Sequence, residues 1–200
     1  QHISTDKVLG RLSASEGDVE EVTVSEDLSG SIAAHTSLAT AKAIKAYVDS
    51  ISGLRVGRAV HIQGTAASGL TTTIPDDDTV PANSEGSEVC SVAYTPTSTS
   101  NIIRMHFQGR IFNSSSGGGM IIAFFEGSTC KQGFYWTQPS SGAIFHTFEF
   151  EFNPAATSST TYSVRIGKTG GTSWGYDATS TARFDGLNKA PTLTVEEWNV

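Results

Sequence analysis

A strict alternation of side-chain polarity runs through the segment Ile103–Ile111 (IRMHFQGRI). Its odd positions hold isoleucine, methionine and phenylalanine, interrupted only by Gly109, and its even positions hold arginine, histidine and glutamine. Successive side chains of a β-strand point to opposite faces of its sheet, so a period of two predicts a strand with one face in a core and the other in solvent. The segment therefore indicates a half-buried strand of an antiparallel sheet.

The same period recurs towards the C-terminus. Apolar and polar residues alternate over 147–152, 162–166 and 193–196, whereas Met120–Phe125 is apolar at every position and is expected to be covered on both faces. Clusters of Gly, Pro, Ser, Asn and Asp separate these segments, as turns do. About eight short strands in about 145 residues predict that 54–200 folds as an antiparallel β-sandwich of the jelly-roll type.

The segment 37–53 has a helical pattern instead. It is rich in alanine, Thr36 and Ser37 are suitable N-cap residues, and Gly53 is a stop signal. About four turns are too short to be stable alone, so the apolar stripe must pack on something. The spacing leaves two partners open, the helix's own domain or its copies in a short parallel bundle. The expected trimer seam is Leu38, Ala41, Ile44, Val48 and Ile51.

Residues 1–36 are acidic and lack sustained periodicity. The chain has a net charge of −7, and residues 1–30 hold seven acidic and two basic residues. We expect an extended linker or attachment segment that cannot bury a core by itself. The absence of a basic patch argues against nucleic-acid binding, and no apolar run is long enough for membrane insertion. Because the chain begins with Gln1 rather than Met, we expect a processed product or a piece of a longer protein.

Three parts of the chain resemble bacteriophage tail fibres and receptor-binding proteins. Residues 5–21 (TDKVLGRLSASEGDVEE) are similar to a linker of such fibres, and 37–50 (SLATAKAIKAYVDS) to the short helix that follows it. Residues 74–96 and the closing segment 193–197 (LTVEE) resemble a β-sandwich tip domain. The resemblance implies a homotrimeric virion appendage whose N-terminal side binds other tail or virion proteins and whose tip faces the host.

This resemblance sets the functional expectations. It implies a viral structural protein, made in the bacterial host cytoplasm and located in the virion, that binds a host surface glycan or protein during adsorption without a cofactor. One alternative is a head-fibre, decoration or baseplate-attached protein without direct receptor binding, because the tip segment does not separate tail fibres from head fibres. The other alternative is a small glycan hydrolase or esterase.

Two aromatic segments beside turn residues are the candidate receptor contacts, namely 135–138 (YWTQ) and 173–177 (SWGYD). Binding residues are often carried on loops, where aromatic rings stack on sugars and polar groups bind their hydroxyls. The alternative is that both tryptophans fill the ends of the sandwich or the trimer interface. The expected receptor-binding residues are Tyr135, Trp136, Gln138, Trp174, Tyr176 and Asp177.

The sequence carries no hydrolase, metalloprotease or nucleotide-binding motif, so we expect neither an enzyme nor a metal site. Asp76–Asp78 is interpreted as a solvated acidic turn rather than a Ca²⁺ loop, which needs alternate positions. Glu149 and Glu151 fit the paired carboxylates of a glycosidase only loosely. If their strand lies beside Ile103–Ile111, cross-strand ion pairs follow; otherwise the two faces could meet across subunits.

Two cysteines, Cys90 and Cys130, are expected to remain unbridged.

Overall fold

The computed structural model describes residues 7–10, 20–25, 37–39, 41–51, 53–113, 118–138, 142–170, 173–177 and 190–200. The chain divides into two compact units, Gln1–Leu54 and Arg55–Val200. The structure is mainly β, as the alternating segments predicted. Within the described residues, no helix is long and apolar enough to cross a membrane.

The described residues of unit 1 form a three-stranded sheet and one helix. Strand β1 (Lys7–Gly10) pairs antiparallel with β2 (Glu20–Ser25), β2 pairs parallel with β3 (Ser37–Ala39), and helix α1 spans Ala41–Ser50. The predicted helix over 37–53 is therefore too long, and Leu38, expected in the helical stripe, lies in a strand. Pairing with β2 satisfies backbone hydrogen-bonding groups of Ser37–Ala39. Such tertiary pairing outweighs a weak helix propensity.

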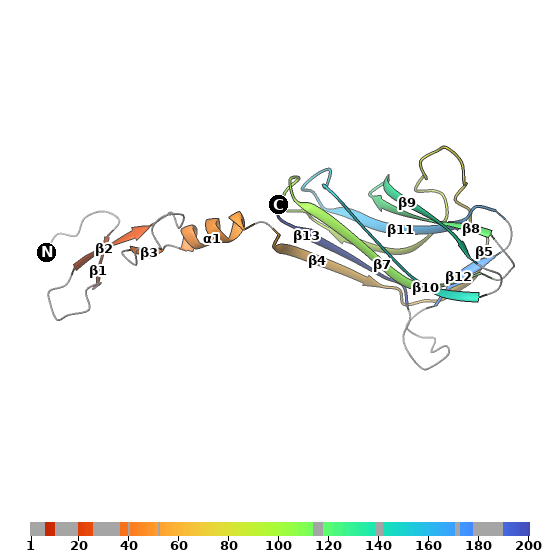
Figure 1. Ribbon diagram of the computed structural model, residues 1–200, viewed down its shortest axis with the longest axis horizontal. Helices are drawn as coiled ribbons and strands as arrows, with labels where there is room; N and C mark the ends of the chain where they lie inside the picture. Colours follow the sequence, from red (N-terminus) through yellow and green to blue (C-terminus); the bar gives the residue numbers. More distant parts are fainter. Residues whose placement is uncertain are drawn as a thin grey trace. The chain divides into compact units, whose positions relative to one another are not determined.

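Unit 2 consists of two antiparallel sheets (Figure 1). The first sheet has the order β4-β13-β7-β12-β5, and β10 pairs with the other edge of β7. The second sheet has the order β6-β11-β8-β9. The first sheet comprises β4 (Arg55–Ile62), β5 (Ala67–Leu70), β7 (Ile102–Asn113), β10 (Gly142–Phe152), β12 (Trp174–Tyr176) and β13 (Thr192–Trp198). The second comprises β6 (Ser87–Tyr94), β8 (Gly118–Glu126), β9 (Thr129–Gln138) and β11 (Thr160–Lys168).

The two sheets pack face to face around one hydrophobic core, which makes unit 2 a β-sandwich. Along β7, buried residues such as Met105 and Phe107 alternate with partly exposed ones, as predicted from Ile103–Ile111. Phe124 and Val164 of the second sheet belong to the same cluster. Each fully buried side chain of this kind contributes about 1.5–3 kcal/mol.

Strand β8 is buried on both faces, as its apolar run predicted. Its inner residues join the core between the sheets. Ile121, Ala123 and Phe125 form a second cluster on the outer face of the second sheet, where Ile74 packs over them. Ile74 lies in the connection between β5 and β6, so this connection covers a sheet face that would otherwise meet water.

Both cysteines are free thiols in different surroundings. Cys90 of β6 is buried in the main core, whereas Cys130 of β9 is partly exposed beside the second cluster. Burial raises the pKa of the Cys90 thiol to about 12. Burial also raises the pKa of Cys130.

Candidate functional site

The expected binding residues of the segment 173–177 lie in the core rather than on a loop. Trp174 and Tyr176 belong to β12, and both are buried, as is Asp177. Trp174 Nε1 donates a hydrogen bond to the carbonyl oxygen of Thr72 (3.3 Å), and Arg110 Nη1 donates to Asp177 Oδ2 (2.5 Å). The loop placement expected for this segment is wrong, and in the single chain these three side chains are not exposed to a receptor. The alternative interpretation, in which Trp174 fills the sandwich, agrees with this placement.

Gly175 explains why the sequence suggested a loop here. A Cβ at this position would overlap the carbonyl oxygen of Ala67 and the ring of Phe112. The glycine therefore allows β12 to fit closely between β5 and β7. Glycine within a strand often marks such a close backbone approach, and sequence alone does not distinguish it from a turn glycine.

The segment 135–138 is placed differently. Tyr135 is 53% exposed, whereas Trp136 is half-buried. The ring centroid of Trp136 lies 4.8 Å from that of His146 and 5.4 Å from that of Phe148. Burial lowers the pKa of His146. Consecutive residues of a strand point to opposite faces, so Tyr135 and Trp136 do not present their side chains to one ligand. Gln138 ends β9, and its side chain lies outside the described residues.

The outer face of the first sheet carries a regular array of polar side chains, which we call the polar face. In the register of the strands, Arg104 lies opposite Glu151 on one side and Glu196 on the other. The next two rows are centred on His106 and Gln108 of β7. The polar face comprises Arg104, His106, Gln108, Thr147, Glu149, Glu151, Thr192, Thr194 and Glu196.

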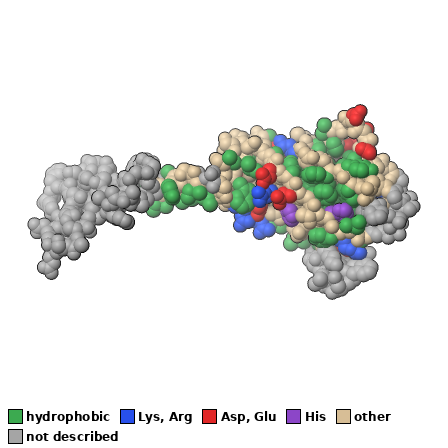
Figure 2. All heavy atoms as spheres, viewed as in Figure 1, with side chains coloured by type: hydrophobic (Ala, Val, Ile, Leu, Met, Phe, Trp, Pro, Cys, Tyr) green, Lys and Arg blue, Asp and Glu red, His purple; other side chains and the backbone are tan. Residues whose placement is uncertain are grey.

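Arg104 is the centre of the charged row. Its Nη2 lies 2.5 Å from Glu151 Oε1, its Nε lies 3.7 Å from Glu149, and its guanidinium carbon is 5.1 Å from the ring centroid of Trp198. The hydrogen bond to Glu151 raises the pKa of Arg104. The cross-strand ion pairs expected for neighbouring strands are thus confirmed. In Figure 2, acidic and basic side chains lie next to one another on the visible side of unit 2.

The charged row continues onto β4. Arg55 Nη1 lies 2.7 Å from Glu196 Oε1, and Arg58 Nε lies 3.6 Å from the same oxygen. Exposed pairs of this kind are worth about 0–1 kcal/mol, so they orient side chains more than they stabilise the fold. Glu149 and Glu151 both lie beside the same cation, Arg104. The acid and the base of a glycosidase need carboxyl groups in contrasting environments, and a shared cation does not provide that contrast.

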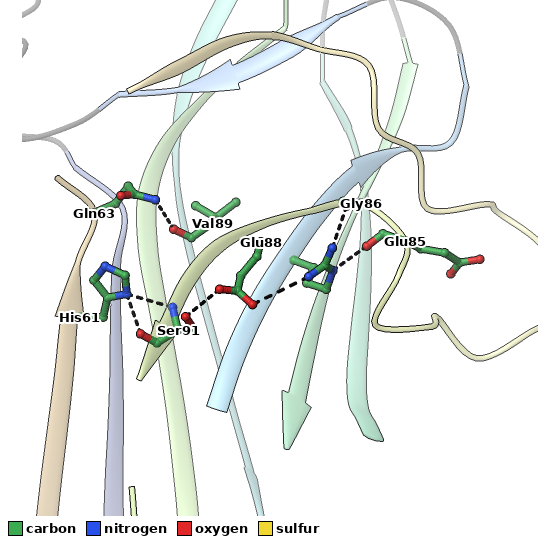
Figure 3. A network of polar contacts seen from close by, with 8 residues as sticks. His61, Gln63, Glu85, Gly86, Glu88, Val89 and Ser91 are labelled. Carbon is green, nitrogen blue, oxygen red and sulfur yellow. Dashed lines mark hydrogen bonds and ion pairs between the residues drawn. The ribbon is translucent and has the colours of Figure 1, made fainter. Parts of the chain in front are cut away.

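A second polar network covers the free edge of β6 (Figure 3). His61 Nδ1 lies 2.7 Å from the carbonyl oxygen and 2.9 Å from the amide nitrogen of Ser91. Gln63 Nε2 donates to the carbonyl oxygen of Val89 (2.7 Å). Side chains from β4 and the residues after it therefore occupy backbone groups of an edge strand that could otherwise pair with another chain.

The same network argues against a nucleophilic serine at Ser91. A serine nucleophile needs its hydroxyl hydrogen-bonded to the base that activates it. Ser91 Oγ instead donates to Glu88 Oε1 (2.7 Å), and His61 contacts only the backbone of Ser91. Arg165, whose Nε donates to the carbonyl oxygen of Glu85 (2.7 Å), lies 3.8 Å from Glu88. This geometry is that of a structural edge network.

Glu197 is a buried carboxylate that the sequence analysis missed. Its side chain is 0% exposed and accepts hydrogen bonds from Tyr94 Oη (2.7 Å), Asn101 Nδ2 (2.7 Å) and the Thr97 amide (2.8 Å). Burial raises the pKa of Glu197, but these hydrogen bonds outweigh burial and leave it below its usual value. The carboxylate thus anchors the β6–β7 connection to β13. In the sequence, Glu197 shares a strand face with the apolar residues Leu193 and Val195, and this was the available signal that its side chain is buried.

The acidic turn Asp76–Asp78 is exposed. Asp77 Oδ1 accepts hydrogen bonds from the amide (2.8 Å) and hydroxyl (2.6 Å) of Thr79, which lower the pKa of Asp77. This is a local Asx turn. Across the part of the chain that the structure describes, no three His, Cys, Asp or Glu side chains are grouped to hold a metal ion.

Comparison with known proteins identifies no family for this chain. No protein-family model matches it, and no curated protein matches its sequence. Among solved structures, it is similar to dimeric latent PorU from Porphyromonas gingivalis, with a TM-score of 0.33 and 9% sequence identity. That match covers 75% of this chain and 14% of the PorU chain, and at this TM-score it carries no functional argument.

Proposed function

We propose that this chain is part of a bacteriophage virion fibre protein that binds a host surface glycan during adsorption. The polar face is the observation that carries the proposal. Guanidinium, carboxylate, imidazole, amide and hydroxyl groups stand there in register, with Trp198 beside Arg104. Such groups donate and accept the hydrogen bonds that sugar hydroxyls require, and an aromatic ring adds an apolar surface.

The strand orders support a jelly roll for the sandwich. The strands β4-β13-β7-β10 lie in one sheet and β6-β11-β8-β9 in the other. Jelly rolls consist of eight such strands in two sheets and occur in viral and lectin domains. The architecture is compatible with an adhesin but does not specify one, because a single fold supports many functions.

The helix supports association into a trimer. Ile44 and Val48 of α1 and the following Ile51 are exposed in the single chain, at the spacing of a heptad stripe. A ten-residue helix with such a stripe gains stability by packing on copies of itself. Three weak glycan sites on one fibre would then bind a cell through avidity. The N-terminal unit would face the other virion proteins.

Binding of the fluorescently labelled chain to a panel of bacterial strains tests the function. We expect some strains to be labelled, and unlabelled chain to block adsorption of a phage that infects them. The variants His106→Ala and Glu149→Gln should each reduce labelling at least tenfold. Tyr135→Ala, on the other sheet, is the control and should leave labelling within twofold of the unmodified chain.

Two outcomes contradict the proposal. A folded chain that labels no strain would favour the head-fibre or decoration alternative. Labelling that is lost with Tyr135→Ala but retained with His106→Ala and Glu149→Gln would move the binding site to the outer face of the second sheet. Release of oligosaccharide from cell envelopes, abolished by Glu149→Gln, would support a glycan hydrolase instead.

A further inference from the structure

One row of side chains across the first sheet contains no ionisable group. Gln108 of β7 lies opposite Thr147 of β10 and Thr192 of β13, and Thr192 lies opposite Ile62 of β4. Residues opposite one another in antiparallel strands project from the same face of the sheet. Neighbouring strands lie about 4.8 Å apart, so this row extends over about 14 Å. We call these four residues the uncharged row, and they offer a ligand several uncharged groups in a line.

Apolar side chains border the hydrogen-bonding groups of the uncharged row. Ile62, at its β4 end, is 53% exposed. Val60 is 40% exposed and lies opposite Thr194 in the next row, and Phe145 is 50% exposed and lies opposite Arg110 in the row on the other side. Sugar rings present apolar C–H groups on their faces and hydroxyl groups at their edges. A surface that combines apolar side chains with a few polar groups matches both features.

The cations of the polar face and of β4 already have carboxylate partners. Arg104 lies beside Glu149 and Glu151, and Arg55 and Arg58 lie beside Glu196. An acidic sugar would have to compete with these carboxylates for a guanidinium group. The carboxylate of Glu149, 49% exposed in the row next to the uncharged row, would also repel it. The charges of this surface therefore disfavour an anionic ligand.

We propose that the polar face selects an uncharged glycan and that Gln108 is a specificity-determining residue. The inference rests on the proposed function and names the substrate class of its site. The amide of Gln108 both donates and accepts hydrogen bonds, as a sugar hydroxyl does, whereas a carboxylate ligand would satisfy only its donor groups. The hydroxyls of Thr147 and Thr192 have the same double capacity. Glu149 accepts hydrogen bonds from sugar hydroxyls, which agrees with its part in the proposed function.

Binding of the full chain to a glycan array tests the substrate class. The array carries uncharged hexose and N-acetylhexosamine oligosaccharides beside the same oligosaccharides extended with sialic or uronic acid. We expect uncharged members to bind at least tenfold more tightly than their acidic counterparts. Their affinity should change less than twofold between 0.05 and 0.5 M NaCl, because salt screens the attraction between charges and an uncharged ligand has none.

Two variants of unit 2 connect the preference to these residues. Gln108→Ala should weaken binding of the uncharged oligosaccharides at least tenfold. Gln132→Ala is the matched control, because Gln132 is an exposed glutamine on β9 of the second sheet, and it should stay within twofold of the unmodified chain. Glu151→Gln removes one carboxylate from Arg104 and should raise the ratio of acidic to uncharged binding at least threefold. Circular dichroism verifies that each variant is folded.

The inference and the proposed function fail in different ways. If acidic oligosaccharides bind more tightly and their binding weakens with salt, the uncharged class is overturned while the adhesin function stands. Labelling of bacterial strains without binding of any uncharged oligosaccharide has the same meaning. Equal weakening by Gln108→Ala and Gln132→Ala overturns the role of Gln108. A folded chain that labels no strain and binds no oligosaccharide overturns both the inference and the proposed function.

Discussion

The phenol ring of Tyr94 lies against the backbone of Gly57, where a Cβ would overlap its hydroxyl oxygen. The same hydroxyl donates to Glu197 Oε2 at 2.7 Å. Gly57 in β4 therefore provides the space in which Tyr94 of β6 reaches a buried carboxylate of β13. This contact joins an edge strand of each sheet to the closing strand of the sandwich.

Gly57→Ala is expected to destabilise unit 2 by about 1–3 kcal/mol, the usual cost of forcing an extra group into a packed site. The added methyl would displace Tyr94 and lengthen its hydrogen bond to Glu197. Urea unfolding followed by fluorescence measures the change. Gly64→Ala is the control, because nothing lies within 4 Å of a Cβ at that position. Equal stability of the two variants would contradict this account of Gly57.

Glu197→Gln is expected to lower the free energy of unfolding by about 1–3 kcal/mol. Glutamine keeps the size of the side chain, but its amide group turns a donor towards the donors of Tyr94, Thr97 or Asn101. The neighbouring Glu196→Gln removes only partly exposed ion pairs and should cost less than about 1 kcal/mol. Denaturant midpoints of the two variants provide the comparison, and the reverse order would disprove the anchoring role.

Acid should weaken unit 2 through Glu197. The pKa of Glu197 is lowered in the folded chain, so its contribution is complete above the unfolded pKa of about 4.3 and is lost as the pH falls through the folded value. The stability of the unmodified chain should therefore fall below about pH 4 more steeply than that of Glu197→Gln. Thermal melts between pH 3 and 7 test this, and parallel curves for both proteins would exclude Glu197 as a source of acid sensitivity.

The ion pair between Arg104 and Glu151 should be weak and sensitive to salt. Both side chains are partly exposed, so a double-mutant cycle with Arg104→Ala and Glu151→Ala should give a coupling of about 0.2–1 kcal/mol. The coupling should decrease between 0.05 and 0.5 M NaCl because salt screens exposed charges. A salt-independent coupling above about 2 kcal/mol would mean that the pair is shielded from solvent.

Thiol labelling should separate the two cysteines. At pH 8 we expect a disulfide reagent to modify Cys130 of the native chain, because its side chain is partly exposed. Cys90 should react only as the core opens, because it is buried and its thiol has a pKa of about 12. Cys130→Ser should leave no fast-reacting thiol. Rapid modification of Cys90 in that variant would contradict the core assignment.

The strands and much of the core were predictable from the sequence because they depend on local periodicity. Residues two positions apart share a strand face whatever the partner strand is, so Ile103, Met105 and Phe107 could be assigned to the core. The apolar run Met120–Phe125 likewise required cover on both faces, although only the structure identifies Ile74 as part of that cover.

The candidate site was less predictable because it depends on which strands become neighbours. Arg104 and Glu151 are 47 positions apart, and the sequence supported their pairing only on the condition that β7 and β10 lie side by side. The segment with Trp174 has the composition of a loop, yet pairing with β5 and β7 buries it.

The sequence by itself determined the period of each strand and therefore which side chains turn inward. The tertiary structure decided the partners: Ser37–Ala39 as a strand beside β2, Trp174 in the core and Glu197 beneath the β6–β7 connection. The physical reason is that side-chain alternation is fixed by the backbone of one strand, whereas hydrogen bonding and burial depend on residues brought close only when the whole chain has folded.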